Sequence, residues 1–234
     1  MSDHLQFSAI FAAPFGEQLW AGLQVTLWIT CASWLLAMSV GTFLAIMRMS
    51  GSGACGKVVT AYVAYHQNVP MLVHILLWYF GIASLLPTGI QAWANEHHGE
   101  QIFAVMAIGL YMAAYFSEDI RSGLRSIPSG QYEASRSLGL GYLKSMRYVI
   151  LPQTFRIAMP PFINHTVLLF KNTSLAMAIG VAELTYTVRE IENQTYRTFE
   201  AFFIATMFYV LVCLVLMVVG AITAHMTRIP TTSK

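Results

Sequence analysis

Five long apolar segments, separated by short polar stretches, set the hydrophobicity pattern of this chain. The first contains the run LWITCASWLLAMSVGTFLAIM, which carries no charge. Each segment supplies the roughly 20 mostly apolar residues that a helix needs to cross a bilayer. The pattern predicts an all-α, polytopic membrane protein with five transmembrane helices. The predicted spans cover residues 19–47, 58–86, 102–122, 155–179 and 199–224, and they belong to a single membrane domain over residues 1–234.

The composition also favours a membrane environment. Of the 234 residues, 56% are hydrophobic and 10% are charged, whereas a soluble domain has roughly 25% charged residues. So few charges cannot cover a water-soluble surface, and we expect membrane lipid around the chain. The formal net charge of +2 gives no reason to expect a nucleic-acid partner. Cys31, Cys55 and Cys213 show no spacing that indicates a disulfide framework or a metal site.

The basic residues predict the orientation in the membrane. An excess of Lys and Arg marks cytoplasmic loops, and ten of the thirteen basic residues fall on alternate polar stretches. These ten are Arg48, Lys57, Arg121, Arg125, Arg136, Lys144, Arg147, Arg156, Arg228 and Lys234. The loop over residues 87–101 has none, and the loop over residues 181–198 mixes two arginines with three glutamates. We therefore expect the N-terminus outside and the C-terminus in the cytoplasm of a bacterial inner membrane.

The connection between the third and fourth spans, residues 127–152, is the most informative polar stretch. Residues 132–138 and 142–149 predict two short amphipathic helices. Gly139 and Gly141 lie between them and permit a sharp turn, because glycine tolerates backbone angles that other residues avoid. The pattern predicts a helical hairpin on the cytoplasmic face, basic at its rim and apolar on one side, which is typical of a docking element. The alternative is an ordinary amphipathic surface hairpin.

A longer motif runs through this hairpin. Its positions are Glu133, Ala134, Ser135, Gly139, Val149, Leu151 and Pro152. This spacing resembles the cytoplasmic loop of type I ABC importer permeases, which contains Glu-Ala-Ala, three residues, Gly, nine residues and then Ile-x-Leu-Pro. Ser135 replaces one small residue by another, and Val149 replaces one β-branched residue by another. Neither departure alters the predicted hairpin, and Pro152 suits the first turn of the next helix.

Four further segments resemble the polar amino acid permeases of the histidine and glutamine type. They are QNVPMLVHILLWYFG at residues 67–81, AAYFSEDIRSGLRSIPSGQ at 113–131, LFKNTSLAMAIGVAEL at 169–184 and TYRTFEAF at 195–202. The resemblance covers most of the chain from residue 20 onward. Many relatives place a Glu and an Arg shortly before the Asn-x-Pro of the second span, where this chain has Ala64 and Gln67. The resemblance therefore assigns no substrate role to charges at those two positions.

The resemblance implies the permease subunit of an ABC importer for a polar amino acid, which is a transport subunit rather than an enzyme. ATP and Mg²⁺ would bind a partner ABC ATPase subunit, and this chain would bind no cofactor. The other expected partners are a second permease subunit, homologous or identical, and a periplasmic amino-acid-binding protein. The hairpin would be the coupling helix that follows closure of the ATPases and drives alternating access. The implied coupling residues are Glu133, Ala134, Ser135, Arg136, Gly139, Leu151 and Pro152.

Polar groups inside predicted spans are candidate substrate contacts, because such groups are costly in a membrane. The second span is expected to break near Pro70, whose ring removes a helical hydrogen bond, and Gln67 and Asn68 then lie roughly halfway across. Transporters often place substrate at broken helices. The alternative is a proline kink that only shapes the helix bundle.

Lys171 is the only basic residue deep within a predicted span, and neutral hydrogen-bonding residues follow it. A cation beside such residues suits a carboxylate, which favours an anionic substrate such as glutamate or aspartate. The alternative is a structural salt bridge from Lys171 to Glu118 or Asp119 in the third span. The remaining candidate substrate contacts are Asn164, His165, Asn172, Thr173 and Ser174.

Two other classes of protein are weighed against the importer. A secondary transporter driven by an ion gradient would need coupling-ion sites and usually internal repeats, and the sequence shows neither. A metal- or haem-binding protein is indicated only by His66, His74 and His165, whose spacing matches no ligand motif. The segment GSGACGKV at residues 51–58 nearly matches a phosphate-binding loop. However, a predicted span precedes it instead of a strand, and Val58 stands where a hydroxyl should bind magnesium.

Overall fold

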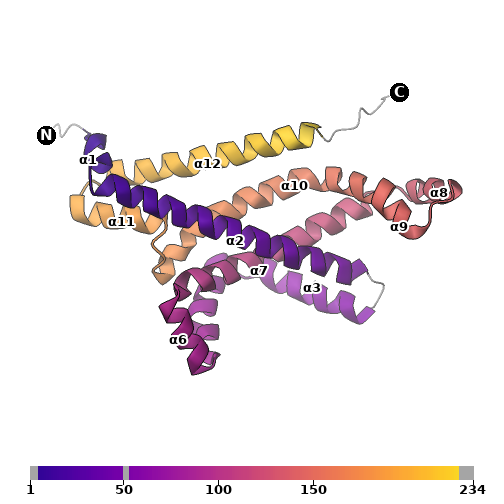
Figure 1. Ribbon diagram of the computed structural model, residues 1–234, viewed down its shortest axis with the longest axis horizontal. Helices are drawn as coiled ribbons and strands as arrows, with labels where there is room; N and C mark the ends of the chain where they lie inside the picture. The colour runs from indigo at the N-terminus through magenta and orange to yellow at the C-terminus, as the bar shows by residue number, and fades with distance from the viewer. Residues whose placement is uncertain (1–4, 50–52, 227–234) are drawn as a thin grey trace.

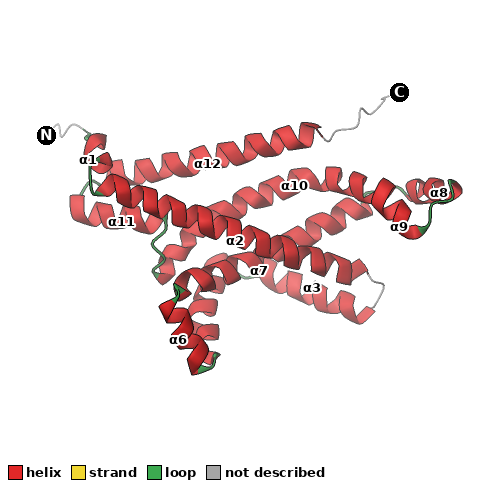
Figure 2. Cartoon of the chain, viewed as in Figure 1, coloured by secondary structure: helices red, strands yellow, loops and turns green. Residues whose placement is uncertain are grey.

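Helices make up nearly all of the computed structural model, which describes residues 5–49 and 53–226 (Figure 1). No strand occurs in these two ranges (Figure 2). The helices longer than ten residues are α2 (Phe15–Met49), α3 (Gly53–Asn68), α7 (Gly99–Arg125), α10 (Leu151–Asn172), α11 (Leu184–Thr195) and α12 (Thr198–Met226). The shorter α-helices are α1 (Phe7–Phe11), α4 (Met71–Leu76), α5 (Ala83–Leu85), α6 (Thr88–Glu96), α8 (Ser129–Ser137) and α9 (Tyr142–Ser145). Two π-helical segments, η1 (Leu77–Ile82) and η2 (Met146–Ile150), and a 3₁₀-helix, η3 (Thr173–Ile179), complete the list.

Three helices, α2, α7 and α12, are long and apolar enough to cross a membrane. Two helix pairs pass the same test together although each is bent, by 107° between α3 and the α4–α5 segment and by 51° between residues 142–179 and α11. The described residues therefore hold three spans, or up to five if each bent pair is one span. The predicted all-α, polytopic fold is confirmed. The predicted number of five transmembrane spans is reached when each bent helix pair is counted as one span.

Helix α7 lies at the centre of the bundle, and α12 lies at its edge. In the most apolar stretch of α7, 61% of the residues are buried, against 11% in that of α12. Helix α2 packs along α7 because small residues let the two backbones approach. A Cβ on Gly41 would lie 3.0 Å from the carbonyl oxygen of Ala113, and a Cβ on Gly109 would lie 2.6 Å from Leu36. The most apolar 18-residue stretch of α12 has a mean hydropathy of 2.9, so its outer side suits lipid.

The predicted second span breaks at Pro70. Helix α3 ends at Asn68 and α4 begins at Met71, since a prolyl ring removes a helical hydrogen bond and clashes with the preceding turn. The chain then turns by 107°, so this segment is not one straight helix. His66 and His74 lie on either side of the break, are both buried and stack their rings with 4.9 Å between centroids. The histidine pair therefore packs the two segments against each other.

Two segments predicted as loops contain helices. Residues 87–101 hold α6, and residues 181–198 hold α11. The Glu183 carboxylate caps α11 by accepting hydrogen bonds from two backbone N–H groups of its first turn, at 3.0 and 2.9 Å. The residues that α11 buries in the core are Leu184, Thr187, Val188 and Ile191. This spacing is typical of an amphipathic helix, and the several charges of the segment obscured it.

The elongated shape of the molecule separates its two ends. Figure 1 shows the hairpin of α8 and α9 at one end of the long axis, and α1 and α11 at the other. Helix α2 runs between these ends, and the hairpin extends beyond the last turns of α2 and α7 (Figure 1). The polar connection that the sequence singled out is thus a projection from the helix bundle.

Candidate functional site

A tight turn at Gly139 joins the two helices of the hairpin. Gly139 has a φ of 76°, a left-handed conformation that costs little for glycine and is unfavourable for other residues. The backbone N–H of Gly139 donates to the carbonyl of Arg136 at 2.9 Å, and that of Leu140 donates to Ser135 at 3.1 Å. The predicted turn at Gly139 is confirmed. Gly141 has a φ of −66°, which any residue adopts.

The second helix of the hairpin does not end at residue 149, where the sequence predicted its end. It continues from α9 through the π-helical residues of η2 into α10. Pro152 lies in the first turn of α10, directly after the π-helical segment. The prolyl nitrogen has no hydrogen to donate, and a change of helical hydrogen-bond spacing at this point accommodates it. The hairpin is therefore joined to α10 without a flexible loop.

Two serine hydroxyls meet inside the hairpin. Ser135 Oγ on α8 lies 2.9 Å from Ser145 Oγ on α9, and the two residues are 2% and 4% exposed. The carbonyls of Tyr132 and Leu140 accept hydrogen bonds from these hydroxyls at 2.8 and 3.3 Å. Partial burial and the neighbouring Tyr142 raise the pKa of the Tyr132 phenol above its ordinary value. The motif residue Ser135 therefore faces the inside of the hairpin and not its outer surface.

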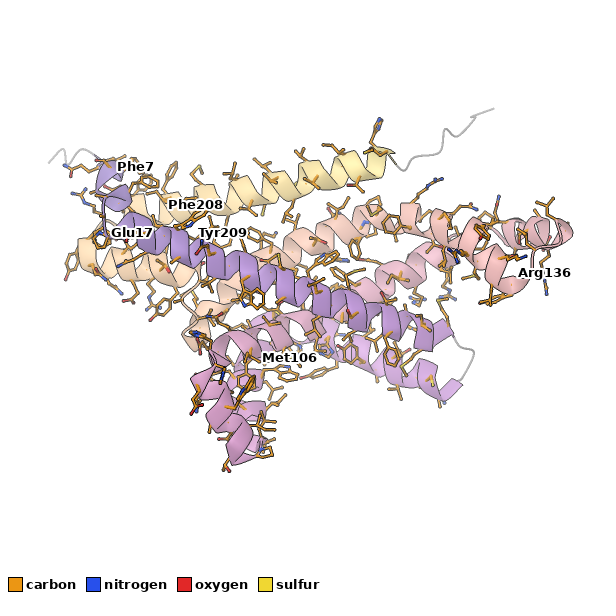
Figure 3. All side chains as sticks on the ribbon, in the orientation of Figure 1. Phe7, Glu17, Met106, Arg136, Phe208 and Tyr209 are labelled. Atoms are coloured by element: carbon orange, nitrogen blue, oxygen red, sulfur yellow. The ribbon has the colours of Figure 1, made fainter. Side chains whose placement is uncertain are left out.

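The outer surface of the hairpin mixes charged and apolar side chains. Glu133 and Arg136 are exposed, and Figure 3 shows Arg136 at the end of the molecule. Leu138 and Leu143 are each 80% exposed, and Tyr142 is 69% exposed. The motif residues Ala134, Leu151 and Pro152 are exposed as well. Exposed leucines on a projecting element indicate a protein-docking surface. The family motif does not contain Leu138, Tyr142 or Leu143, so the sequence did not single them out.

Two neighbouring carboxylates near the hairpin end of α7 hold the adjacent helices. Glu118 accepts hydrogen bonds from Arg48 at the end of α2 and from Arg121 one turn later, whose Nε lies 2.9 Å away. Asp119 Oδ2 lies 2.7 Å from Nδ1 of His165 on α10. The Asp119 side chain is 7% exposed, so this contact is largely shielded from water. The two carboxylates therefore join α7 to both of its neighbours.

Helices α7 and α10, which flank the hairpin in sequence, pack closely. A Cβ on Gly123 would lie 3.0 Å from the Cβ of Ala158 and 3.0 Å from the carbonyl oxygen of Thr154. Farther from the hairpin, the rings of Phe116 and Phe162 lie 4.4 Å apart between centroids. Together with the carboxylate–imidazole contact, these contacts make α7 and α10 a tightly packed pair.

The predicted substrate contacts are divided among three places. Gln67 and Asn68 are exposed at the break between α3 and α4, and Asn68 Nδ2 donates to the carbonyl of Ala64 at 2.7 Å. The ring of His165 faces α7, where Asp119 holds it. The third place is the region of Lys171, between α10 and α12.

Lys171 and Ser174 line an open cavity of about 350 Å³. The other residues that line the cavity are Tyr209, Val210, Cys213 and Leu214 of α12. Lys171 is exposed, and the ion pairs formed within residues 5–49 and 53–226 do not include it. Glu118 and Asp119 have other partners. The alternative of a salt bridge from Lys171 to one of these carboxylates is therefore wrong.

The candidate residues near Lys171 differ in the exposure of their side chains. Asn164 is exposed seven residues earlier, about two helical turns away and so on the same side of α10. Asn172 is half-buried. The Ser174 hydroxyl donates to the Lys171 carbonyl at 2.7 Å. Thr173 is fully buried and donates to the carbonyl of Phe170 at 2.7 Å, so its side chain points into the protein.

The part of the chain that the structure describes supports neither a metal site nor a phosphate-binding loop. Within it, no group of three or more His, Cys, Asp or Glu side chains could hold a metal ion. The glycine-rich segment begins at Gly51, and residues 50–52 lie outside the described residues. Its later residues, from Gly53, begin α3 and follow α2, which is a helix and not the strand that a phosphate-binding loop follows.

Residues 37–228 match the family described as "Binding-protein-dependent transport system inner membrane component". The chain belongs to this family. As a permease of this family it is a multi-pass inner-membrane transport subunit, and the match agrees with its long apolar helices.

Curated relatives of this permease carry names of amino acid permeases. "Glutamate/aspartate import permease protein GltJ" of Escherichia coli (strain K12) is 31% identical over 227 residues, which cover 93% of this chain and 92% of that protein. "Glutamate/aspartate import permease protein GltK" of Escherichia coli O6:H1 is 32% identical, over 82% of this chain and 86% of that protein. "Arginine transport system permease protein ArtQ" of Bacillus subtilis (strain 168) is 31% identical, over 93% and 94%. The resemblance to amino acid permeases is confirmed.

Solved structures share the fold of this permease. The structure described as "Crystal structure of an amino acid ABC transporter with histidines" has a TM-score of 0.82 and 28% identity, and the match covers 95% of this chain and 99% of that chain. An inward-facing structure of the MetNI methionine ABC transporter has a TM-score of 0.73 and 16% identity, over 93% and 100%, and it supports the fold alone. The predicted type I ABC importer permease fold is confirmed.

Proposed function

We propose that this permease forms part of the membrane path of an ATP-binding-cassette importer for a polar amino acid, with glutamate or aspartate as its substrate. The family and the amino acid permeases among its relatives support the transport role. The single observation that carries the mechanism is the hairpin of α8 and α9, which projects beyond the bundle with leucine and tyrosine side chains exposed. The function proposed for this hairpin is to receive the movement of an ATPase.

The hairpin docks into an ABC ATPase subunit in this proposal. Leu138 and Leu143 offer apolar area to bury, and such burial contributes roughly 25 cal/mol per Å². Glu133 and Arg136 add one charge of each sign beside the leucines, and complementary charges fix the register of a complex. The proposed coupling residues are Glu133, Ala134, Ser135, Arg136, Gly139, Leu151 and Pro152. ATP and Mg²⁺ bind the ATPase subunit, so the permease needs neither a catalytic residue nor a cofactor.

Lys171 supports an anionic substrate. It is an exposed cation in the last turn of α10, within a predicted span, and a charged side chain inside a membrane is costly unless it has a partner. A substrate carboxylate in the cavity that Lys171 lines would offset this cost and would receive further hydrogen bonds from neutral side chains nearby. The other proposed pathway residues are Gln67, Asn68, Asn164, His165, Asn172, Thr173 and Ser174.

A second permease subunit completes the path. GltJ and GltK carry the same substrate in their names, which supports pairing with a homologous subunit in preference to an identical copy. A periplasmic amino-acid-binding protein delivers the substrate at the end that carries α1 and α11. The basic residues favour an external N-terminus and a cytoplasmic C-terminus, although Arg228 and Lys234 lie outside the described residues.

Uptake by sealed vesicles that contain the assembled transporter tests this function. Radiolabelled glutamate should accumulate only when ATP is supplied on the hairpin side, because the ATPase subunits bind there. Collapsing the proton and sodium gradients with ionophores should leave the initial rate unchanged. Uptake that ignores ATP and stops when the gradients collapse would identify an ion-driven secondary transporter, which is the competing class.

A further inference from the structure

We propose that the paired hydroxyls of Ser135 and Ser145 make the coupling hairpin one rigid body, and that this rigidity sets how many substrate molecules are transported per ATP hydrolysed. The inference rests on the proposed function, because it assigns the two serines a role in passing on the movement of the ATPase. They are positioning residues, since their hydroxyls point into the hairpin and away from any docked partner.

Two of the three proton arrangements of the hydroxyl pair place a hydrogen bond between Ser135 and Ser145. Each serine has one hydroxyl proton, and three contacts are available: Ser135 to Tyr132, Ser135 to Ser145, and Ser145 to Leu140. When Ser135 donates to Ser145, Ser145 donates to Leu140. When Ser145 donates to Ser135, Ser135 donates to Tyr132. The bond between the two helices is made in both of these arrangements, and it is absent only when both hydroxyls donate to the backbone carbonyls.

Helix α8 of the hairpin is too short to hold its orientation alone. Helix α8 has nine residues, and a helix of this length depends on packing for stability. The hydroxyl pair is buried from water on both sides, which strengthens its bond. A further side-chain hydrogen bond joins α8 to α10, from Gln153 to Gln131 at 3.2 Å, but it is exposed. The buried serine pair is therefore the stronger connection of the two.

Rigidity matters because the hairpin lies between the ATPase and the membrane helices. Helix α9 continues into α10, and α10 packs tightly on α7 where Gly123 meets Ala158. Movement of the ATPase against the outer surface of α8 is passed on to α10 only if the angle between α8 and α9 stays fixed. If the pair opened, α8 would swing about the turn at Gly139 and the ATPase would close without moving the membrane helices.

A larger, apolar side chain at the serine pair should uncouple ATP hydrolysis from transport. Ser135→Val replaces the hydroxyl with two methyl groups where the residue is 2% exposed, so α8 must move away from α9. We expect transport per ATP hydrolysed to fall several-fold while ATP hydrolysis continues. Ser137→Val on the exposed side of α8 is the matched control and should leave the ratio unchanged. A folding defect alone would lower the amount of protein and leave this ratio intact.

A covalent lock gives the opposite test. Ser135→Cys with Ser145→Cys, in a chain whose three native cysteines are replaced by alanine, places two thiols at the buried contact, and diamide oxidises them to a disulfide. The oxidised protein should transport with the same ratio as the wild type, because the hairpin is proposed to move as one unit. Loss of transport on oxidation, recovered on reduction, would overturn the proposal.

The outcomes separate this inference from the proposed function. If wild-type uptake does not depend on ATP, the proposed function fails and the serine pair has no movement to pass on. If wild-type uptake is ATP-driven and Ser135→Val keeps the wild-type ratio at normal abundance, only the serine inference fails.

Discussion

The environment of Lys171 bears most directly on substrate choice. The side chain is exposed beside an open cavity, and the carboxylates that could have neutralised it from α7 are held by Arg48, Arg121 and His165. A charged side chain inside a membrane is unfavourable unless it has a partner. In the proposed function, a substrate carboxylate is the anionic partner of Lys171.

Replacing Lys171 should impair uptake without removing the protein from the membrane. A hydrogen bond to a charged group contributes about 1.5–3 kcal/mol, and 1.4 kcal/mol is a factor of ten. We expect Lys171→Met to lower the uptake rate of labelled glutamate about tenfold or more, measured against permease abundance on immunoblots. Lys171→Arg keeps the charge and should retain a larger share of uptake. An equal loss of uptake and abundance in the methionine variant would contradict the substrate role.

At the scale of elements, the hairpin turn could be predicted because its chemistry is local. A glycine between two short amphipathic stretches indicates a turn, and Gly139 adopts the positive φ that requires it. The continuation of α9 into α10 could not be predicted from Pro152, since a proline in the first turn suits both a new helix and a helix that passes through a π-helical segment. Helix α11 was missed because its charges hid the spacing of Leu184, Val188 and Ile191.

The two glycines of the turn give a matched pair of variants. Gly139→Ala forces alanine into a left-handed conformation, which costs roughly 1–2 kcal/mol, whereas Gly141→Ala lies at an ordinary φ with nothing within 4 Å of the new Cβ. A cost of this size increases the fraction of molecules in which the hairpin turn is open about 5–30-fold. Tryptic cleavage at Arg136 and Lys144 should accelerate by a similar factor for Gly139→Ala and remain at the wild-type rate for Gly141→Ala. Equal rates for both variants would show that the turn does not hold the hairpin.

The partners of the site residues could not be predicted, because they come from distant parts of the chain. Asp119 and His165 are 46 positions apart and meet only because α7 and α10 pack. For the same reason the sequence left open a salt bridge from Lys171 to α7 that is not formed. The apolar surface of the hairpin escaped notice for a different reason: amphipathic patterning shows that a helix has an apolar face and does not show which leucines remain exposed.

At the scale of the whole molecule, the arrangement links a projecting hairpin to a membrane bundle. The hairpin lies at one end of the long axis, and α1 and α11 lie at the other (Figure 1). Between them, α7 is the buried centre and α12 the exposed edge. This division suits a subunit that is moved from one side and lies against lipid along α12. The total length and apolarity of the segments determine the fold, so this level was predictable from the sequence.

The proposed function requires a separate ATPase to contact the hairpin, and site-directed cross-linking detects that contact. Leu143→Cys, in a chain with Cys31, Cys55 and Cys213 replaced, places a thiol at a position that is 80% exposed. A photoactivatable reagent on this thiol should cross-link the permease to a nucleotide-hydrolysing subunit in the assembled transporter. The same reagent on Ile90→Cys of α6 should give no such product. Cross-linking to the ATPase from α6 and none from the hairpin would contradict the claim.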